Sequence, residues 1–215
     1  MLNVFLGYDP RQPLAYNVCQ HSIIRHASEP IAITPLVLNQ MPVKRRGLTE
    51  FTYSRFLVPW LCNYQGRALF MDADIAVAGD VSELFRELGH GFSAAVMQNQ
   101  ERFEWASVIF FNCFNCRALS PSYVANDKNA MFDMKWADHG LGELPPEWNH
   151  CVHYMQPKKA KLYHYTAGLP CWPETRNTEE AEVWGAEFLE AFSTCSWQEL
   201  MGNSVHAKLI EEAAC

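Results

Sequence analysis

Short apolar runs alternate with stretches of helical periodicity through the first hundred residues of the chain. The first run, Leu2 to Leu6, ends at a Gly-Tyr-Asp-Pro sequence that is typical of a turn. Apolar positions then recur at roughly helical spacing from Pro13, a residue suited to the first turn of a helix, to Arg25. This alternation predicts β-strands joined by α-helices.

The same patterns predict the remaining elements. Further strands are expected from short apolar runs at residues 31–38, 68–71, 93–97 and 108–111. Helices are expected from Thr49, as the N-cap, to residues 60–64, and over residues 178–192 and 197–210. Residues 120–146 have weak periodicity and many turn formers, so we expect loops and short helices there.

This order of elements predicts a three-layer α/β fold, in which helices flank a central sheet. The sequence shows no internal repeat, low-complexity tract or flexible linker, and its 215 residues fit one domain with a full hydrophobic core. We therefore predict a single domain over residues 1–215.

Composition and charge limit the classes of partner. Hydrophobic residues make up 49% of the chain and charged residues 19%, which is an ordinary globular balance. The formal net charge of −7 argues against nucleic acid or an anionic membrane surface as the partner. A small polyanionic ligand stays compatible with this charge if a metal ion supplies positive charge locally.

Several features together predict a cytoplasmic location. The N-terminal residues enter a strand-like run at once and lack a signal-peptide pattern, and no apolar stretch approaches the ~20 residues of a spanning helix. Cys113 and Cys116 form a single CxxC among eight cysteines, without a second pair at zinc-ribbon spacing. Reduced, mostly buried thiols are therefore expected.

An acidic pair, Asp72 and Asp74, follows the apolar run at residues 68–71. Ligands of open α/β sheets bind at the carboxyl ends of strands, and residues two apart in an extended chain point the same way. Two adjacent carboxylates repel each other, and a divalent cation such as magnesium or manganese relieves the repulsion. The triplet alone is equally compatible with two solvated loop residues after a core strand.

Two further segments strengthen the interpretation of the acidic pair as a metal site. The triplet and the Ile-Ala-Val that follows it resemble the donor-site segment of retaining, glycogenin-like glycosyltransferases of family 8. Residues 52–55 resemble the arginine-containing helix of that family, and residues 162–168 resemble its histidine-containing segment. The three matches occur in the family's order, and the resemblance extends from Val4 to Trp172.

The resemblance implies a single GT-A (Rossmann-like) domain with a mixed, mostly parallel central sheet flanked by helices. The nucleotide-binding half would cover about residues 1–100, and the acceptor half with the C-terminal helices about residues 101–215. The implied function is metal-dependent transfer of a sugar from a nucleotide-diphosphate sugar, a UDP-sugar, with retention of configuration. The acceptor, whether glycan, lipid or protein, is not encoded in any motif, and self-association into a homo-oligomer is open.

The resemblance also assigns the metal ligands, which would be Asp72, Asp74 and His164. An imidazole beside carboxylates favours manganese over magnesium. Taken without the family, His164 would be read as a hydrogen-bonded structural histidine between two tyrosines.

Donor contacts are implied for a second group of residues. Arg55 would bind the donor and stabilise charge during catalysis, unless it forms an ion pair on a helix surface with Glu50 or Glu83. The remaining donor-binding positions implied by the family are Gly7, Tyr8, Asp9, Asp72, Ala73, Asp74 and Gly168.

The sequence departs from the family near the donor sugar. Residues 105–108 lack the asparagine expected there, and Asp133 and Asp138 are the catalytic candidates in the region of the family's Asp-Gln pair. Because neither is securely placed as a nucleophile, we expect a front-face mechanism in which the departing phosphate accepts the proton of the incoming hydroxyl.

Three alternatives stay open at this point. These departures would fit a catalytically degenerate homologue that binds a nucleotide without turnover. A phosphatase of the haloacid-dehalogenase type also places two aspartates after an apolar strand, although Val77 lies one position too late for its pattern. A nucleotidyltransferase would need a glycine-rich basic loop, which the Gly-Tyr-Asp-Pro-Arg segment matches poorly.

Overall fold

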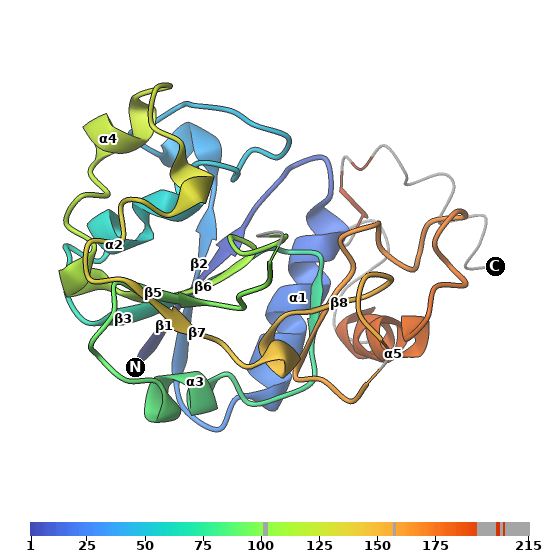
Figure 1. Cartoon of the computed structure of the whole chain (residues 1–215). Coiled ribbons are helices and arrows are strands. Elements are labelled where there is room, and N and C mark those ends of the chain that lie inside the picture. The colour runs from blue at the N-terminus through green and yellow to red at the C-terminus, as the bar shows by residue number, and fades with distance from the viewer. Residues whose placement is uncertain (101–102, 157, 193–200, 203, 205–215) are drawn as a thin grey trace. The chain divides into compact units, whose positions relative to one another are not determined.

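The computed structural model describes residues 1–100, 103–156, 158–192, 201–202 and 204, and Figure 1 shows the elements in them. The chain divides into two compact units. Unit 1 comprises residues 1–8, 28–72 and 81–145, and unit 2 comprises residues 9–27, 73–80 and those from 146 onward. The organisation of residues 1–215 as one domain stays a prediction.

Unit 1 is built on a six-stranded sheet in the order β2-β1-β3-β6-β5-β7. Its strands are β1 (Leu2–Gly7), β2 (Ile31–Leu36), β3 (Arg67–Met71), β5 (Ala94–Val96), β6 (Val108–Asn112) and β7 (Leu141–Glu143). β1 runs parallel to β2 and β3, β7 runs parallel to β5, and β6 is antiparallel to both of its neighbours. The α/β class and the mixed, mostly parallel sheet are therefore confirmed.

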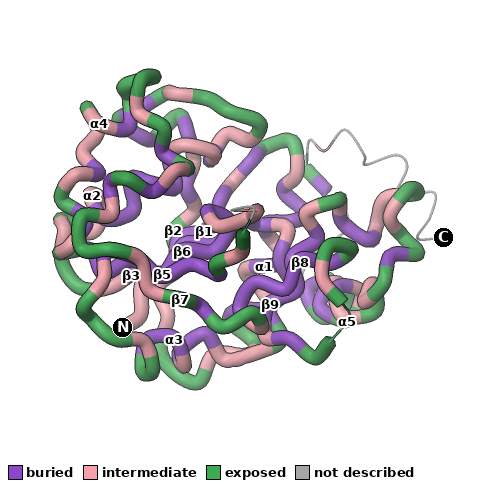
Figure 2. Tube along the Cα trace, viewed as in Figure 1, coloured by how far each residue is buried: buried purple, intermediate pink, exposed green. Residues whose placement is uncertain are grey.

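β3 is a central strand of the sheet in unit 1, and its residues from Ala68 to Met71 are buried (Figure 2). Leu69, Phe70 and Met71 are each 0% exposed, which explains why the run is uniformly apolar rather than alternating. The strand ends at Met71, and Asp72 is the first residue beyond it. The position of Asp72 at the end of a buried strand is as the sequence predicts.

Unit 1 contains only short helices within the described residues. They are α2 (Val58–Leu61), α3 (Ser82–Glu87), α4 (Pro121–Ala125) and 3₁₀ helices at Leu38–Gln40, Ser54–Leu57, Cys113–Asn115 and Met131–Asp133. The short helix and loops expected over residues 120–146 are present, but β7 also lies there. The pattern of β7 gives no signal, because its three residues, Leu-Gly-Glu, include one apolar side chain.

The continuous helix predicted from Thr49 is wrong. Thr49 and Thr52 instead close a turn through their hydroxyls, in which Thr52 Oγ1 accepts from Thr49 N at 3.0 Å. The chain then forms the 3₁₀ helix at Ser54–Leu57 before α2 begins. Pro59 accounts for the break, since an α-helix running through it would lose the hydrogen bond to the carbonyl of Arg55.

Unit 2 contains a three-stranded sheet in the order β4-β9-β8, together with two longer helices. Its elements are α1 (Pro13–His26), β4 (Ile75–Val77), the 3₁₀ helix Pro146–Trp148, β8 (His150–Cys151), β9 (Leu162–His164) and α5 (Ala181–Phe192). β9 is antiparallel to β4 and parallel to β8. The three strands are too short to produce a periodic pattern, and the sequence did not predict them as a sheet.

Helix α1 is fixed to its neighbours in unit 2 by polar contacts. The Ser22 hydroxyl accepts a hydrogen bond from the Val77 backbone at 3.1 Å, which joins α1 to β4. Arg25 Nη1 donates to the Glu187 carboxylate at 3.0 Å, which joins α1 to α5. The prediction of α1 is confirmed, and that of the helix over residues 178–192 is confirmed from Ala181 onward; most of the segment 197–210 lies outside the described residues.

Among the helices of the described residues, none has both the length and the apolar character required to cross a bilayer. The six cysteines within this part of the chain are free thiols: Cys19, Cys62, Cys113, Cys116, Cys151 and Cys171. Cys62 and Cys171 are half-buried and the other four are buried.

Cys62 and Cys171 are expected to differ in reactivity despite similar exposure. The Cys113 thiol donates a hydrogen bond that lowers the pKa of Cys62, whereas burial raises the pKa of Cys171 to about 12. The thiolate is the reactive form, so iodoacetamide should modify Cys62 well before Cys171 near neutral pH. Peptide mass spectrometry over a time course measures the two rates.

The matched variant is Cys113→Ala, which removes the hydrogen-bond donor and should slow labelling of Cys62 without affecting Cys171. Labelling of Cys62 should also begin at lower pH than labelling of Cys171, since a lowered pKa yields thiolate earlier as pH rises. Faster modification of Cys171 would contradict the assignment.

Candidate active site

Asp72 is held at the end of β3 by contacts within unit 1. Its backbone N–H donates to the Ser107 carbonyl at 2.8 Å. Its carboxylate faces Arg55, whose Nη1 lies 3.1 Å from Oδ1 and 3.4 Å from Oδ2. With only 12% of the Asp72 side chain exposed, this carboxylate is both oriented and charge-compensated by Arg55.

Arg55 is buried, which places it away from an exposed helix surface. Its Nη1 also donates to the Ala106 carbonyl at 2.6 Å. The guanidinium carbon lies 4.9 Å from the ring centroid of Phe70 and 5.4 Å from that of Phe51, within the range of cation–π attraction. The structure thus gives Arg55 a defined role as the anchor of Asp72, while direct contact with a donor stays a prediction.

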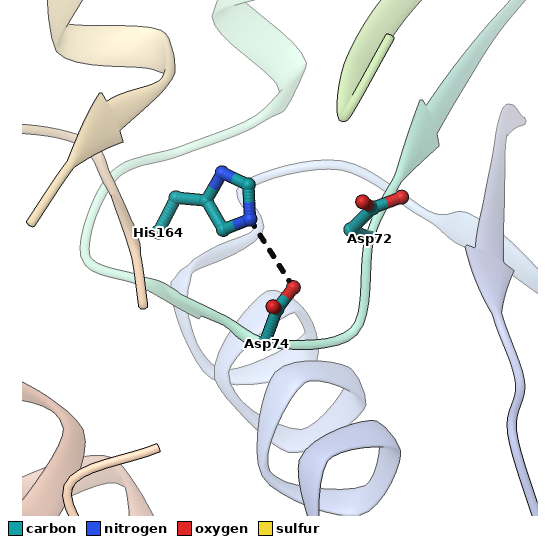
Figure 3. Close-up of side chains that lie close together, drawn as sticks. All are labelled: Asp72, Asp74 and His164. Carbon is teal, nitrogen blue, oxygen red and sulfur yellow. Dashed lines mark ion pairs between the residues drawn. The ribbon is translucent and has the colours of Figure 1, made fainter. Parts of the chain in front are cut away.

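Asp74 and His164 come together within unit 2. The pairing of β4 with β9 sets Ile75 opposite His164, and the Asp74 carbonyl accepts from Tyr165 N at 2.9 Å. Asp74 Oδ1 then lies 3.3 Å from His164 Nε2, the ion pair drawn as a dashed line in Figure 3. Asp74 and His164, which are far apart in the sequence, therefore bring a carboxylate oxygen and an imidazole nitrogen next to each other.

The environment of His164 favours its charged form in the absence of a cation. Burial alone lowers the pKa of His164, but the negative charge of Asp74 and the hydrogen bond to it outweigh burial and raise the pKa well above its usual value. On the other side of the ring, Nδ1 lies 3.1 Å from Asn149 Oδ1 and 4.0 Å from Cys151 Sγ.

Asp72, Asp74 and His164 form a candidate set of metal-ligating residues. Asp72 belongs to unit 1, and Asp74 and His164 belong to unit 2. Only Ala73 separates the two aspartates, so covalent geometry limits their Cα atoms to about 7 Å apart. Ala73 therefore links Asp72, which Arg55 anchors, directly to the Asp74–His164 pair.

The structure gives two of the predicted nucleotide-binding positions a packing or pairing role. A Cβ at Gly7 would lie 2.5 Å from the Phe51 ring, so close packing in unit 1 requires glycine there. Asp9 is buried and accepts hydrogen bonds from Arg11, at 2.9 Å from Nε and 2.6 Å from Nη2. Tyr8 is half-buried. Binding of a base or ribose by these residues stays a prediction.

Gly168 and Ala73 are the remaining donor positions implied by the family. Gly168 has φ of +129°, and a Cβ there would lie 2.8 Å from the Trp172 ring, so any other residue would be strained. Ala73 is buried, with 6% of its surface exposed. Their contact with a diphosphate is not tested by these observations.

Asp133 and Asp138 have other interactions in unit 1. Asp133 ends a 3₁₀ helix, and its carboxylate pairs with Lys135 Nζ at 2.9 Å. The negative charge of Asp138 adds to burial in raising the pKa of the Cys116 thiol to about 12. Their assignment as catalytic groups stays a prediction.

Sequence reasoning missed three contacts at the site. These are the contact of the Asn149 amide with His164, the hydrogen bond from Arg55 to the Ala106 carbonyl, and the hydrogen bond from Arg11 to Asp9. A charged pair two residues apart is a signal for the last of these. A backbone carbonyl leaves no trace in the sequence, and the Asn149 contact depends on the pairing of β8 with β9.

Comparisons with known proteins agree on the family. Residues 8–115 match the model of glycosyl transferase family 8. Protein CDI of Arabidopsis thaliana is 31% identical over an alignment of 224 residues, gaps included, that spans 87% of this chain and 86% of that protein.

Solved structures of glycosyltransferases are similar in fold. The bifunctional glycosyltransferase WbbM matches with a TM-score of 0.64 at 17% identity over 94% of this chain, and GlyE of Streptococcus pneumoniae TIGR4 matches with 0.63 at 16% identity over 94%. This chain spans 51% of the WbbM chain and 63% of the GlyE chain. The galactosyltransferase LgtC, solved with donor and acceptor sugar analogues, matches with a TM-score of 0.58 at 13% identity. The match covers 93% of this chain and 100% of the LgtC chain.

The fold is that of the GT-A class of glycosyltransferases. Within that class, the chain belongs to glycosyltransferase family 8.

Proposed function

We propose that this chain transfers a sugar from a UDP-sugar to an acceptor hydroxyl, with a divalent cation held by Asp72, Asp74 and His164. The observation that carries the proposal is the Asp74–His164 pair, in which a carboxylate and an imidazole meet at 3.3 Å in unit 2. Family membership supports the reaction class. The donor, the cation, the acceptor and the stereochemistry are parts of the proposal.

The residues at the site fit such a cation. Oδ1 of Asp74 is buried, and it faces Nε2 of His164 at 3.3 Å, so both ligand atoms lie on the same side of the pair. Two carboxylates and one imidazole are a mixed oxygen and nitrogen set, which suits manganese better than magnesium. Both aspartates are acceptors when ionised and can bind a cation without losing a proton.

Charged side chains of the chain orient the proposed ligands and balance their charges. A cation bound there would offset the negative charge of the departing diphosphate. Arg55 orients Asp72 through its ion pair, and its positive charge limits the repulsion between the two aspartates. Asp74 in turn holds the His164 ring by its ion pair within unit 2.

For the stereochemistry, we propose retention by a front-face route. Asp133 is paired with Lys135, and Asp138 lies near the Cys116 thiol, so neither stands out as a nucleophile. The departing phosphate oxygen would accept the proton of the acceptor hydroxyl while the bond from that hydroxyl to the sugar forms on the same face. A covalent sugar trapped on Asp133 or Asp138 would contradict this route.

Family membership removes the support for the phosphatase and nucleotidyltransferase alternatives. A degenerate homologue that binds a nucleotide without turnover is the second candidate, and the absence of the expected asparagine at residues 105–108 favours it. Tight UDP binding without transfer or hydrolysis would support that candidate. The cytoplasmic location stays a prediction, and the acceptor class and self-association stay open.

Manganese and UDP together are expected to stabilise the chain. A ligand at a hundred times its Kd adds about 2.7 kcal/mol to the free energy of unfolding. For a chain of this size, that stabilisation corresponds to an increase in Tm of about 5–11 °C. Thermal denaturation with UDP and manganese, with each alone, and with both plus EDTA measures the effect.

ADP with manganese is the control for base selectivity and should give a smaller shift than UDP. A screen of UDP-sugars for hydrolysis or transfer under the same conditions then identifies the donor. If no nucleoside diphosphate changes Tm and manganese makes no difference, the proposed function fails.

A further inference from the structure

A buried amide lies behind the proposed metal-binding histidine. Asn149 is 0% exposed, and its Oδ1 lies 3.1 Å from Nδ1 of His164. Asp74 faces the opposite nitrogen of the same ring, Nε2, at 3.3 Å. His164 is therefore contacted at both nitrogens, by residues that all belong to unit 2.

The contact decides which nitrogen carries the proton when the ring is neutral. An amide oxygen can only accept a hydrogen bond, so Nδ1 must be the protonated nitrogen that donates to it. The lone pair of the neutral ring is then on Nε2, the nitrogen that faces Asp74. If the amide nitrogen of Asn149 faced the ring instead, the proton would move to Nε2 and block that nitrogen as a ligand.

Asn149 is well placed to fix the ring because its backbone is held on both sides. Its N–H is bonded to the Pro146 carbonyl of the preceding 3₁₀ helix at 3.4 Å. The next two residues form β8, which pairs in parallel with β9 so that Cys151 lies beside His164. Val152 N–H then donates to the His164 carbonyl at 2.9 Å. The same strand pairing thus positions both the amide and the imidazole.

Cys151 is the rival partner of Nδ1, and it is the weaker one. Its Sγ lies 4.0 Å from Nδ1, at the outer limit for a sulfur contact, and 3.6 Å from the Asn149 carbonyl oxygen, to which its thiol can donate. A thiol is a weak donor and a weak acceptor. The amide oxygen is closer and stronger.

We infer that Asn149 is a positioning residue for the metal site, which holds His164 in the Nδ1–H form so that Nε2 can bind the cation. The inference rests on the proposed function, because it requires His164 to be a ligand. Groups that hold the second nitrogen of a metal-bound histidine typically contribute 10–100-fold to metal affinity.

Manganese affinity, measured by isothermal titration calorimetry on the whole chain, tests the inference. Asn149→Leu keeps a similar volume but removes the acceptor, and it should weaken manganese binding by about 10–100-fold. Asn149→Asp restores an acceptor oxygen and should bind manganese as tightly as the wild type or more tightly. Cys151→Ala removes the rival thiol and should leave the affinity unchanged.

The outcomes separate this inference from the proposed function. If the wild type binds no divalent cation, both fail together. If the wild type binds manganese and a folded Asn149→Leu variant binds it equally well, only the role of Asn149 is overturned. Circular dichroism shows whether Asn149→Leu folds. If it does not, the manganese affinity of Asn149→Asp tests the inference instead. Weaker manganese binding by the folded aspartate variant than by the wild type contradicts the inference.

Discussion

Replacing Asp74 with asparagine is expected to lower the rate of sugar transfer by about a thousandfold or more while the chain stays folded. The substitution keeps the shape of the side chain but removes the negative charge that faces His164 at 3.3 Å. A cation contributes several kcal/mol to the stabilisation of charge in a transition state, and about 1.4 kcal/mol corresponds to a tenfold change in rate. Initial rates with manganese and the best donor from the UDP-sugar screen measure the effect.

An exposed carboxylate that is not among the proposed ligands provides the matched control for Asp74→Asn. Asp127 pairs with Arg45 at 3.3 Å, and 90% of its side chain is exposed. Asp127→Asn makes the same change of charge and should leave both transfer and manganese affinity unchanged. Transfer by Asp74→Asn at the wild-type rate would show that the Asp74–His164 pair is not part of a metal site.

The sequence predicts the parts of the fold that generate a long or uniform pattern. α1 extends over fourteen residues with recurring apolar positions, and β3 is an apolar run because it is a buried central strand. β4, β7, β8 and β9 have only two or three residues each, too few for any periodicity to be measured. Their existence depends on partners distant in the sequence, which a local pattern cannot show.

The sequence likewise indicates some residues of the candidate site and not the contacts between them. The aspartate pair is visible in the sequence because it follows β3 directly, and His164 is visible only through its resemblance to a family segment. The meeting of Asp74 and His164 depends on the antiparallel pairing of β4 with β9. A strand pairing between distant segments also brings Asn149 to His164, which is why its role could not be read from the sequence.

The environment of Arg55 differs from the exposed one that its sequence position also allowed. An arginine at this position suggests a phosphate or sugar ligand, or an exposed ion pair. In the structure it is buried, paired with Asp72, hydrogen-bonded to the Ala106 carbonyl and packed near aromatic rings. Burial makes the pair matter for stability, because neither charge can return to water without local unfolding.

Substituting Arg55 with alanine is therefore expected to lower the free energy of unfolding by about 3–5 kcal/mol. The change would leave the Asp72 carboxylate, whose side chain is 12% exposed, without its guanidinium partner. For a chain of this length, the loss corresponds to a decrease in Tm of about 6–20 °C. Urea unfolding followed by tryptophan fluorescence, and thermal denaturation, measure it.

A double-mutant cycle with Asp72→Asn distinguishes loss of the ion pair from loss of packing. With Asp72 neutral, Arg55→Ala should destabilise the chain much less, because no negative charge is left behind. Arg55→Lys keeps the charge but not the planar guanidinium, so its free energy of unfolding should lie between those of the wild type and Arg55→Ala. An equal loss in both backgrounds would mean that Arg55 stabilises unit 1 through its ring and carbonyl contacts, and that Asp72 does not depend on Arg55 for its place at the end of β3.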